Sequence, residues 1–157
     1  MAKRHESGAS DVTPDAASYT TTINAWARSG EIDAVQRAEE VLEWCEESFN
    51  LGNARARPNT LTYNSMINCY SKSRVGASDK ALAMFESMKE RSRAGAEWCA
   101  PDVVTYTSVI DTLAKEQTAE ATAMAEKLLQ ELEIENAESP NSERLKPNVR
   151  TYTSVSP

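Results

Sequence analysis

The chain has 157 residues, of which 40% are hydrophobic and 26% charged, and its formal net charge at pH 7 is −7. It contains no run of about 18 apolar residues, the length that a transmembrane helix requires, so a soluble protein is expected. Three cysteines without a Cys-x-x-Cys spacing and a single histidine favour reduced core cysteines over a metal site. Because the residues offer no catalytic constellation either, we expect no enzyme, cofactor, metal or small-molecule substrate.

One short segment occurs four times along the chain. Each copy has a proline, then Asp or Asn, and a tyrosine four positions after that Asp or Asn. The copies begin at Pro14, Pro58, Pro101 and Pro147. Their tyrosines are 44, 43 and 46 residues apart, a period that predicts stacked supersecondary units. The predicted organisation is a disordered tail at 1–13, full units at 14–57, 58–100 and 101–146, and a truncated fourth unit at 147–157.

Each full unit predicts two helices. The first begins after Asp15, Asn59 or Asp102, which are good N-caps, and its apolar residues recur at i, i+3, i+4 and i+7. These first stripes lie within residues 19–26, 63–70 and 106–113. A second stripe with the same spacing follows within residues 38–45, 81–88 and 125–132. Breakers such as Gly30 and Gly76 separate the two helices, so the sequence predicts an all-α solenoid of antiparallel helix pairs.

Helix pairs that open with Pro-[Asp/Asn]-x-x-[Ser/Thr]-Tyr-[Thr/Asn]-[Thr/Ser]-x-Ile-[Asn/Asp] resemble pentatricopeptide repeats, and here the resemblance covers residues 14–155. These units are longer than the family's usual repeat, chiefly after the second helix. The resemblance implies a right-handed superhelix and sequence-specific binding of single-stranded RNA. It also implies a role in RNA processing, stability or translation in a mitochondrion or chloroplast, although no transit peptide is readable. The incomplete fourth unit indicates a fragment of a longer array.

The resemblance also implies which residues read the RNA. In the family the residue after the tyrosine and the last residue of the repeat read one base together. The implied pairs are Thr20 with Asn59, Asn64 with Asp102, and Thr107 with Asn148. By the family's code these pairs resemble readers of adenine, uracil and adenine, giving 5′-A-U-A-3′. The side chains that would wedge the bases are Ala17, Leu61 and Val104, with Arg150 in the fourth unit.

Two structural alternatives remain open for these residues. Asn59, Asp102 and Asn148 are also suited to serve only as helix caps. Leu61 and Val104 are also suited to pack in the core rather than to touch a base. The sequence does not choose between these roles.

Charge is distributed unevenly along the units. Residues 31–48 carry seven acidic side chains against Arg37, and residues 119–138 carry six glutamates against Lys127. Both segments are second helices, which lie on the outer, convex side in the family. Each first helix instead ends in a cation, and the resemblance assigns phosphate contacts to Arg28, Lys72 and Lys115. We therefore expect a positive groove on an acidic molecule.

A protein-interaction scaffold of the tetratricopeptide type is the alternative function. It shares the helix-pair plan, and the acidic convex face would be the surface for protein partners. The Trp-x-x-Leu-Gly-x-x-Tyr pattern of that family is absent, which favours RNA as the partner.

Overall fold

The computed structural model describes residues 12–73, 76–139 and 143–155, so residues 1–11 of the expected tail lie outside the described residues. Helices account for all the regular structure in these ranges, which confirms the all-α class. The α-helices are α1 (Ala16–Ser29), α2 (Ala34–Asn50), α3 (Thr60–Lys72), α4 (Ala77–Arg93), α5 (Val103–Ala114), α6 (Ala119–Glu138) and α7 (Val149–Thr153). None of these helices is long and apolar enough to cross a bilayer.

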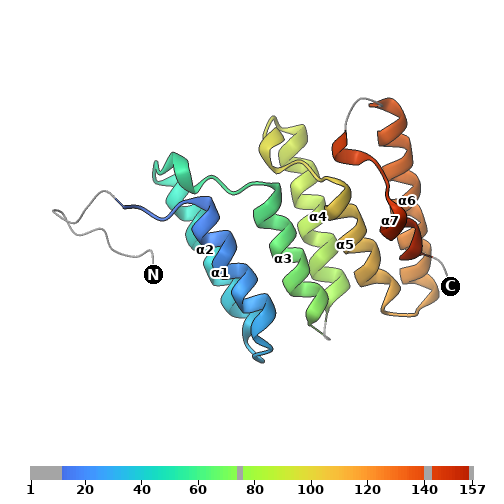
Figure 1. Cartoon of the computed structure of the whole chain (residues 1–157), viewed down its shortest axis with the longest axis horizontal. Helices are drawn as coiled ribbons and strands as arrows, with labels where there is room; N and C mark the ends of the chain where they lie inside the picture. Colours follow the sequence, from blue (N-terminus) through green and yellow to red (C-terminus); the bar gives the residue numbers. More distant parts are fainter. Residues whose placement is uncertain (1–11, 74–75, 140–142, 156–157) are drawn as a thin grey trace.

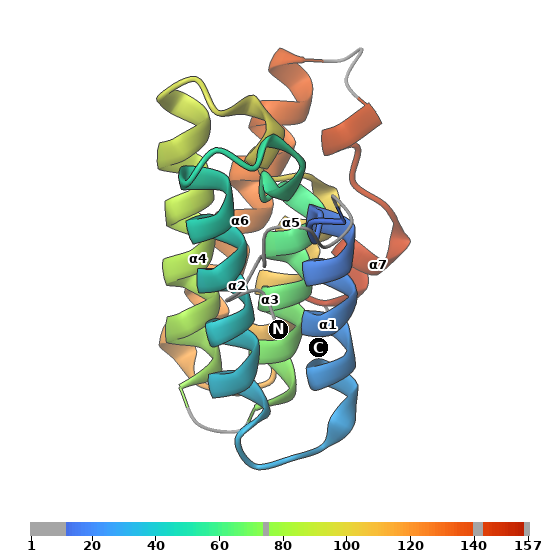
Figure 2. The same ribbon diagram turned by 90° about the vertical axis from the view of Figure 1, so that its left-hand side faces the viewer.

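The helices form a solenoid of antiparallel pairs, α1 with α2, α3 with α4, and α5 with α6, which follow one another along the long axis (Figure 1). Seen from the end, they form two layers (Figure 2). Helices α1, α3, α5 and α7 make one layer, here called the A layer, and neighbours within it are in direct contact. Helices α2, α4 and α6 make the other, the B layer. The A layer therefore places equivalent residues of successive pairs side by side.

The A-layer helices begin where the sequence predicts. Each is capped by a side-chain oxygen that accepts a hydrogen bond from the backbone N–H three residues later, as in Asp15 to Ser18 at 2.8 Å and Asp102 to Thr105 at 2.9 Å. Asn59 and Asn148 cap α3 and α7 in the same way. These bonds satisfy donors that the first helical turn leaves without partners.

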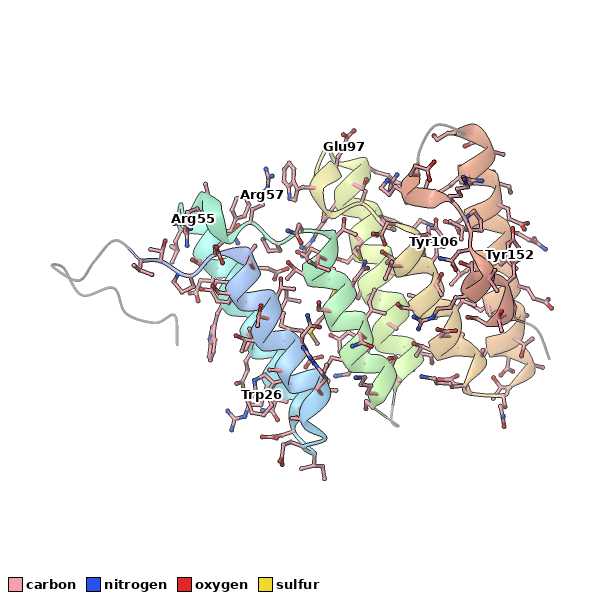
Figure 3. All side chains as sticks on the ribbon, viewed as in Figure 1. Trp26, Arg55, Arg57, Glu97, Tyr106 and Tyr152 are labelled. Carbon is pink, nitrogen blue, oxygen red and sulfur yellow. The ribbon has the colours of Figure 1, made fainter. Side chains whose placement is uncertain are left out.

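The apolar stripes fill the space between the two layers. Phe85 of α4 and Tyr106 of α5, for example, are fully buried and pack edge to face with their ring centroids 4.9 Å apart. Trp26 is an exception, because it is only partly buried at the position where Tyr70 and Leu113 are buried in the later pairs. Within the described residues no helix precedes α1 to cover it, and Figure 3 shows its side chain at the α1 end of the molecule.

The links between pairs are ordered in a way that the sequence analysis missed. Each contains a short 3₁₀ helix, and these are η1 (Ala54–Ala56), η2 (Glu97–Cys99) and η3 (Glu143–Leu145). The last residue of each is buried and lies two positions before the proline of the next segment. All three links lie at one edge of the solenoid, where Figure 3 shows Arg55, Arg57 and Glu97. The extra length of each unit therefore lies outside the A layer.

The B layer is less uniformly acidic than the sequence analysis expected. Helix α4 supplies cations that pair with glutamates of both neighbouring B helices. Lys80 lies 2.9 Å from Glu39 and Arg91 lies 3.0 Å from Glu46, both on α2. On the other side, Lys89 pairs with Glu131 of α6. These pairs connect adjacent units and neutralise part of the negative charge of the convex face.

Candidate nucleic-acid interface

The structure brings the residues of the second reading pair into direct contact. Asn64 on α3 donates a hydrogen bond from Nδ2 to Oδ1 of Asp102, the N-cap of α5, over 3.1 Å. The Asn64 side chain is buried between the two helices, while Asp102 is half-buried. This pair spans the boundary between successive helix pairs, as expected if two residues read one base.

The other two pairs are connected through a third residue. Thr20 lies 2.9 Å, hydroxyl to hydroxyl, from Thr62, whose hydroxyl donates to Oδ1 of Asn59 at 3.1 Å. At the third boundary Thr107 lies 2.9 Å from the hydroxyl of Thr151, which is 3.2 Å from Oδ1 of Asn148. All three predicted pairs are therefore assembled at equivalent places along the A layer.

Capping occupies only one terminal atom of each capping side chain. In Asn59 and Asn148 the atom Oδ1 accepts the capping bonds, and Nδ2 has no hydrogen-bond partner among the described residues. In Asp102 all the intramolecular bonds converge on Oδ1, which leaves Oδ2 without a partner within the same ranges. Neither Nδ2 of Asn59 nor Oδ2 of Asp102 is sealed in the interior. Capping is therefore compatible with a second contact by the same side chain.

The free atoms differ in hydrogen-bonding character. A carboxamide Nδ2 only donates, whereas a carboxylate oxygen only accepts. Asn59 and Asn148 can thus satisfy a ring-nitrogen acceptor such as adenine N1, and Asp102 can satisfy a ring N–H donor such as uracil N3–H. The arrangement can therefore distinguish bases by their Watson–Crick edges.

The predicted wedge residues lie on the surface rather than in the core. Leu61 is 64% exposed and Val104 is 53% exposed, each one turn before the first residue of its reading pair. Ala17, at the equivalent place on α1, is also exposed. The packing alternative for Leu61 and Val104 is therefore wrong. Arg150, at this position on α7, forms an ion pair with Asp111 over 3.1 Å.

Cations lie at the opposite end of α1, α3 and α5 from the N-caps. Arg28, Lys72 and Lys115 are exposed, and none forms an ion pair with any described residue. Helices α1 and α3 carry no acidic residue, and Asp111, the single acidic residue of α5, is neutralised by Arg150. With the cap residues included, the described part of the A layer carries four cations, Arg28, Lys72, Lys115 and Arg150, against three carboxylates, Asp15, Asp102 and Asp111, which is a small positive excess.

Three threonines that contact the reading pairs were missed by the sequence analysis. Thr62, Thr105 and Thr151 stand directly before the repeated tyrosines and are fully buried. The only signal was that Ser or Thr occupies this position in all four copies. A hydroxyl residue near a helix start usually indicates capping alone, so its contacts to the neighbouring pair could not be read from the pattern.

The described residues offer no metal site, because nowhere do three His, Cys, Asp or Glu side chains gather closely enough to hold an ion. The three cysteines are buried and unpaired by disulfides. Burial raises the pKa of all three thiols, that of Cys45 to about 12. Thiols of this kind are poor nucleophiles at neutral pH.

Comparison with known sequences gives three matches. A model of the PPR repeat family matches residues 58–115, and a model of the pentatricopeptide repeat domain matches residues 4–73, so that together they span more than half of the chain. A mitochondrial pentatricopeptide repeat-containing protein of Arabidopsis thaliana is 35% identical over 101 residues, which are 64% of this chain. The matched part is only 15% of that relative's length.

Proposed function

Because the chain belongs to the pentatricopeptide repeat family, we propose that it is a sequence-specific module for single-stranded RNA that reads one base per repeat and has no chemistry of its own. The pairs Thr20–Asn59, Asn64–Asp102 and Thr107–Asn148 read the bases. The exposed side chains Ala17, Leu61 and Val104 wedge between them. The cations Arg28, Lys72 and Lys115 contact the phosphates.

The observation that carries this proposal is that each capping side chain uses only one of its two terminal atoms for capping. Oδ1 of Asn59 and of Asp102 holds the helix start, and the second terminal atom remains available. The free atom is a donor in Asn59 and an acceptor in Asp102. This difference supports adenine at the first and third positions and uracil at the second, the assignment that the family's code gives.

The proposed place of action is an organelle. The similar Arabidopsis protein is mitochondrial by its name, which supports the mitochondrion over the chloroplast. The proposed process is the processing, stabilisation or translation of an organellar transcript. A match to 15% of that relative's length supports a module of a longer array as the acting unit.

The expected affinity for RNA depends on the number of reading pairs. If each stacked and hydrogen-bonded base contributes about 1–3 kcal/mol, three readers contribute roughly 3–9 kcal/mol before the RNA is ordered. Binding is therefore weak, and fluorescence anisotropy at low salt is the suitable test, with labelled RNA that carries tandem A-U-A steps. A variant with G in place of U and the matching DNA are the controls. Tighter binding to the A-U-A RNA than to both controls is expected, and equal binding to all three contradicts base reading.

The scaffold alternative rests on the B layer. Between α2 and α4 lies a groove of about 380 Å³ whose lining includes Glu39, Glu43 and Glu46. Two of these glutamates are already paired with Lys80 and Arg91, so little unpaired charge remains to attract a basic protein. Absence of RNA binding at low salt would favour this alternative.

A further inference from the structure

One buried threonine connects the two residues of each reading pair. Thr105 is 2.6 Å from Oδ1 of Asn64 and 2.9 Å from Oδ1 of Asp102. The Thr62 and Thr151 hydroxyls have equivalent contacts at the other two boundaries. Each threonine is fully buried, so water does not compete for these bonds.

The position before the first tyrosine offers a comparison within the same chain. There Ser18 contacts only its own cap, Asp15, and its side chain is exposed. No reading residue precedes it among the described residues. A buried threonine thus occurs at the three boundaries where a reading residue precedes it, and there its hydroxyl also accepts a hydrogen bond from the backbone N–H of the cap residue. The exposed Ser18 has neither of these two contacts in the described structure.

Two contacts, one with the Thr105 hydroxyl and one with the Asp102 carboxylate, together fix the orientation of the Asn64 carboxamide. The Thr105 hydroxyl faces Oδ1, which turns Nδ2 towards the carboxylate of Asp102. The flipped amide would place Oδ1 against that carboxylate, and two acceptors would face each other without a proton between them. One orientation of the Asn64 donors is therefore favoured before any RNA arrives, and ordering a reader in advance lowers the cost of binding.

We propose that Thr62, Thr105 and Thr151 are positioning residues that hold each reading pair in a single orientation and thereby set base selectivity without touching the base. This inference rests on the function proposed above. Val has nearly the same shape as Thr but no hydroxyl, so Thr105→Val removes one of the two contacts that hold the Asn64 carboxamide while keeping the core filled. The backbone N–H of residue 105 still reaches Asp102, which keeps that capping bond, whereas the backbone N–H of Asp102 loses the Thr105 hydroxyl as its acceptor.

The test compares the affinities of each variant for A-U-A and A-C-A RNA by anisotropy. In Thr105→Val the preference for uracil is expected to fall about fivefold, the loss of roughly one net hydrogen bond. Thr105→Ser retains the hydroxyl and should keep the wild-type ratio. Thr112→Val is the matched control, because Thr112 is buried in the same helix but bonds only to the carbonyl of Ser108. An unchanged ratio in Thr105→Val overturns the inference.

Two further measurements distinguish a failure of the positioning role from a failure of the proposed base reading. Hydrogen exchange of the Asn64 side-chain amide, followed by NMR without RNA, should quicken in Thr105→Val and not in Thr112→Val; equal exchange overturns the positioning role. If Thr105→Val fails to fold by circular dichroism, Thr62→Val gives the same test for adenine against guanine at the first position. A wild-type chain that does not discriminate between bases refutes base reading itself, and the positioning role with it.

Discussion

Asn64 and Asp102 belong to different helix pairs, yet the amide of Asn64 donates to the carboxylate of Asp102 over 3.1 Å. This carboxylate also caps α5 through the same oxygen, Oδ1. One side chain thus takes part in folding one helix, in joining two helix pairs and in the proposed reading of a base. The predictions below separate these roles.

Replacing Asp102 by Asn should change base preference without loss of the cap, since Asn and Asp are equally good N-caps. The variant exchanges a free acceptor for a free donor. We expect the preference at the second position to move from uracil towards cytosine, whose N3 accepts, by about tenfold. Anisotropy with A-U-A and A-C-A RNA measures this shift. A thermal melt should change little, and an unaltered uracil preference would contradict the assignment of Asp102.

Truncating the exposed Leu61 to Ala should weaken RNA binding but leave stability nearly unchanged. Its side chain contributes little to the core, so the unfolding free energy should move by no more than about 0.5 kcal/mol. Loss of apolar contact with a base should lower the affinity about threefold to tenfold. Ile67→Ala is the contrasting control, because Ile67 is fully buried and its truncation should cost about 2–5 kcal/mol of stability. Urea titration of both variants measures the unfolding free energy, and anisotropy measures their affinity for RNA.

Removing the charge of Lys72 should make RNA binding less sensitive to salt. Each phosphate contact on a single strand contributes about 0.7 to the slope of log affinity against log salt concentration. Lys72→Gln should therefore reduce that slope by roughly 0.7. Lys127 is also exposed but lies on α6 in the B layer, so Lys127→Gln serves as the control. Equal slopes for the two variants would contradict the assignment of a phosphate contact to Lys72.

Stability should decline at alkaline pH because the native fold keeps its thiols neutral. An unfolded thiol ionises around its ordinary pKa of 9.0, whereas burial raises the pKa of native Cys45 to about 12. Between these values the unfolded state loses its proton and the native state does not, so the free energy of unfolding falls as pH rises from 9 towards 12. Urea denaturation between pH 8 and pH 10 should show the decline, and Cys45→Ala should show a shallower one. As an independent check, an alkylating reagent at pH 8.5 should modify the thiols only in urea.

Local features of the fold could be predicted from the sequence, because the interactions that define them span only a few residues. The cap of α3 depends on Asn59 and a backbone N–H three residues away. The buried position of Phe85 follows from the helical spacing of its neighbours, and both expectations are confirmed. The 3₁₀ helix that ends at Cys99 was missed, because its only trace is one buried residue in a segment that reads as a polar link.

The candidate site was predictable only in part. The sequence offered capping and base reading as alternatives for Asn59, since the same residue type suits both, and only the structure shows that capping uses Oδ1 and leaves Nδ2 available. The contact between Thr105 and Asn64 joins residues 41 positions apart. It depends on how α3 stacks on α5, which no local pattern specifies. Base reading itself stays a prediction.

The position of each reading pair across a boundary has a consequence for how such arrays diverge by duplication and recombination. Exchanging the segment 58–100 for another copy replaces Asn59, the partner of Thr20, and also Asn64, the partner of Asp102. If the pairs read bases as proposed, a single exchange changes two neighbouring bases of the recognised sequence. On the same proposal, the exchangeable unit that changes only one recognised base runs from the residue after one tyrosine to the threonine before the next, as in residues 64–105.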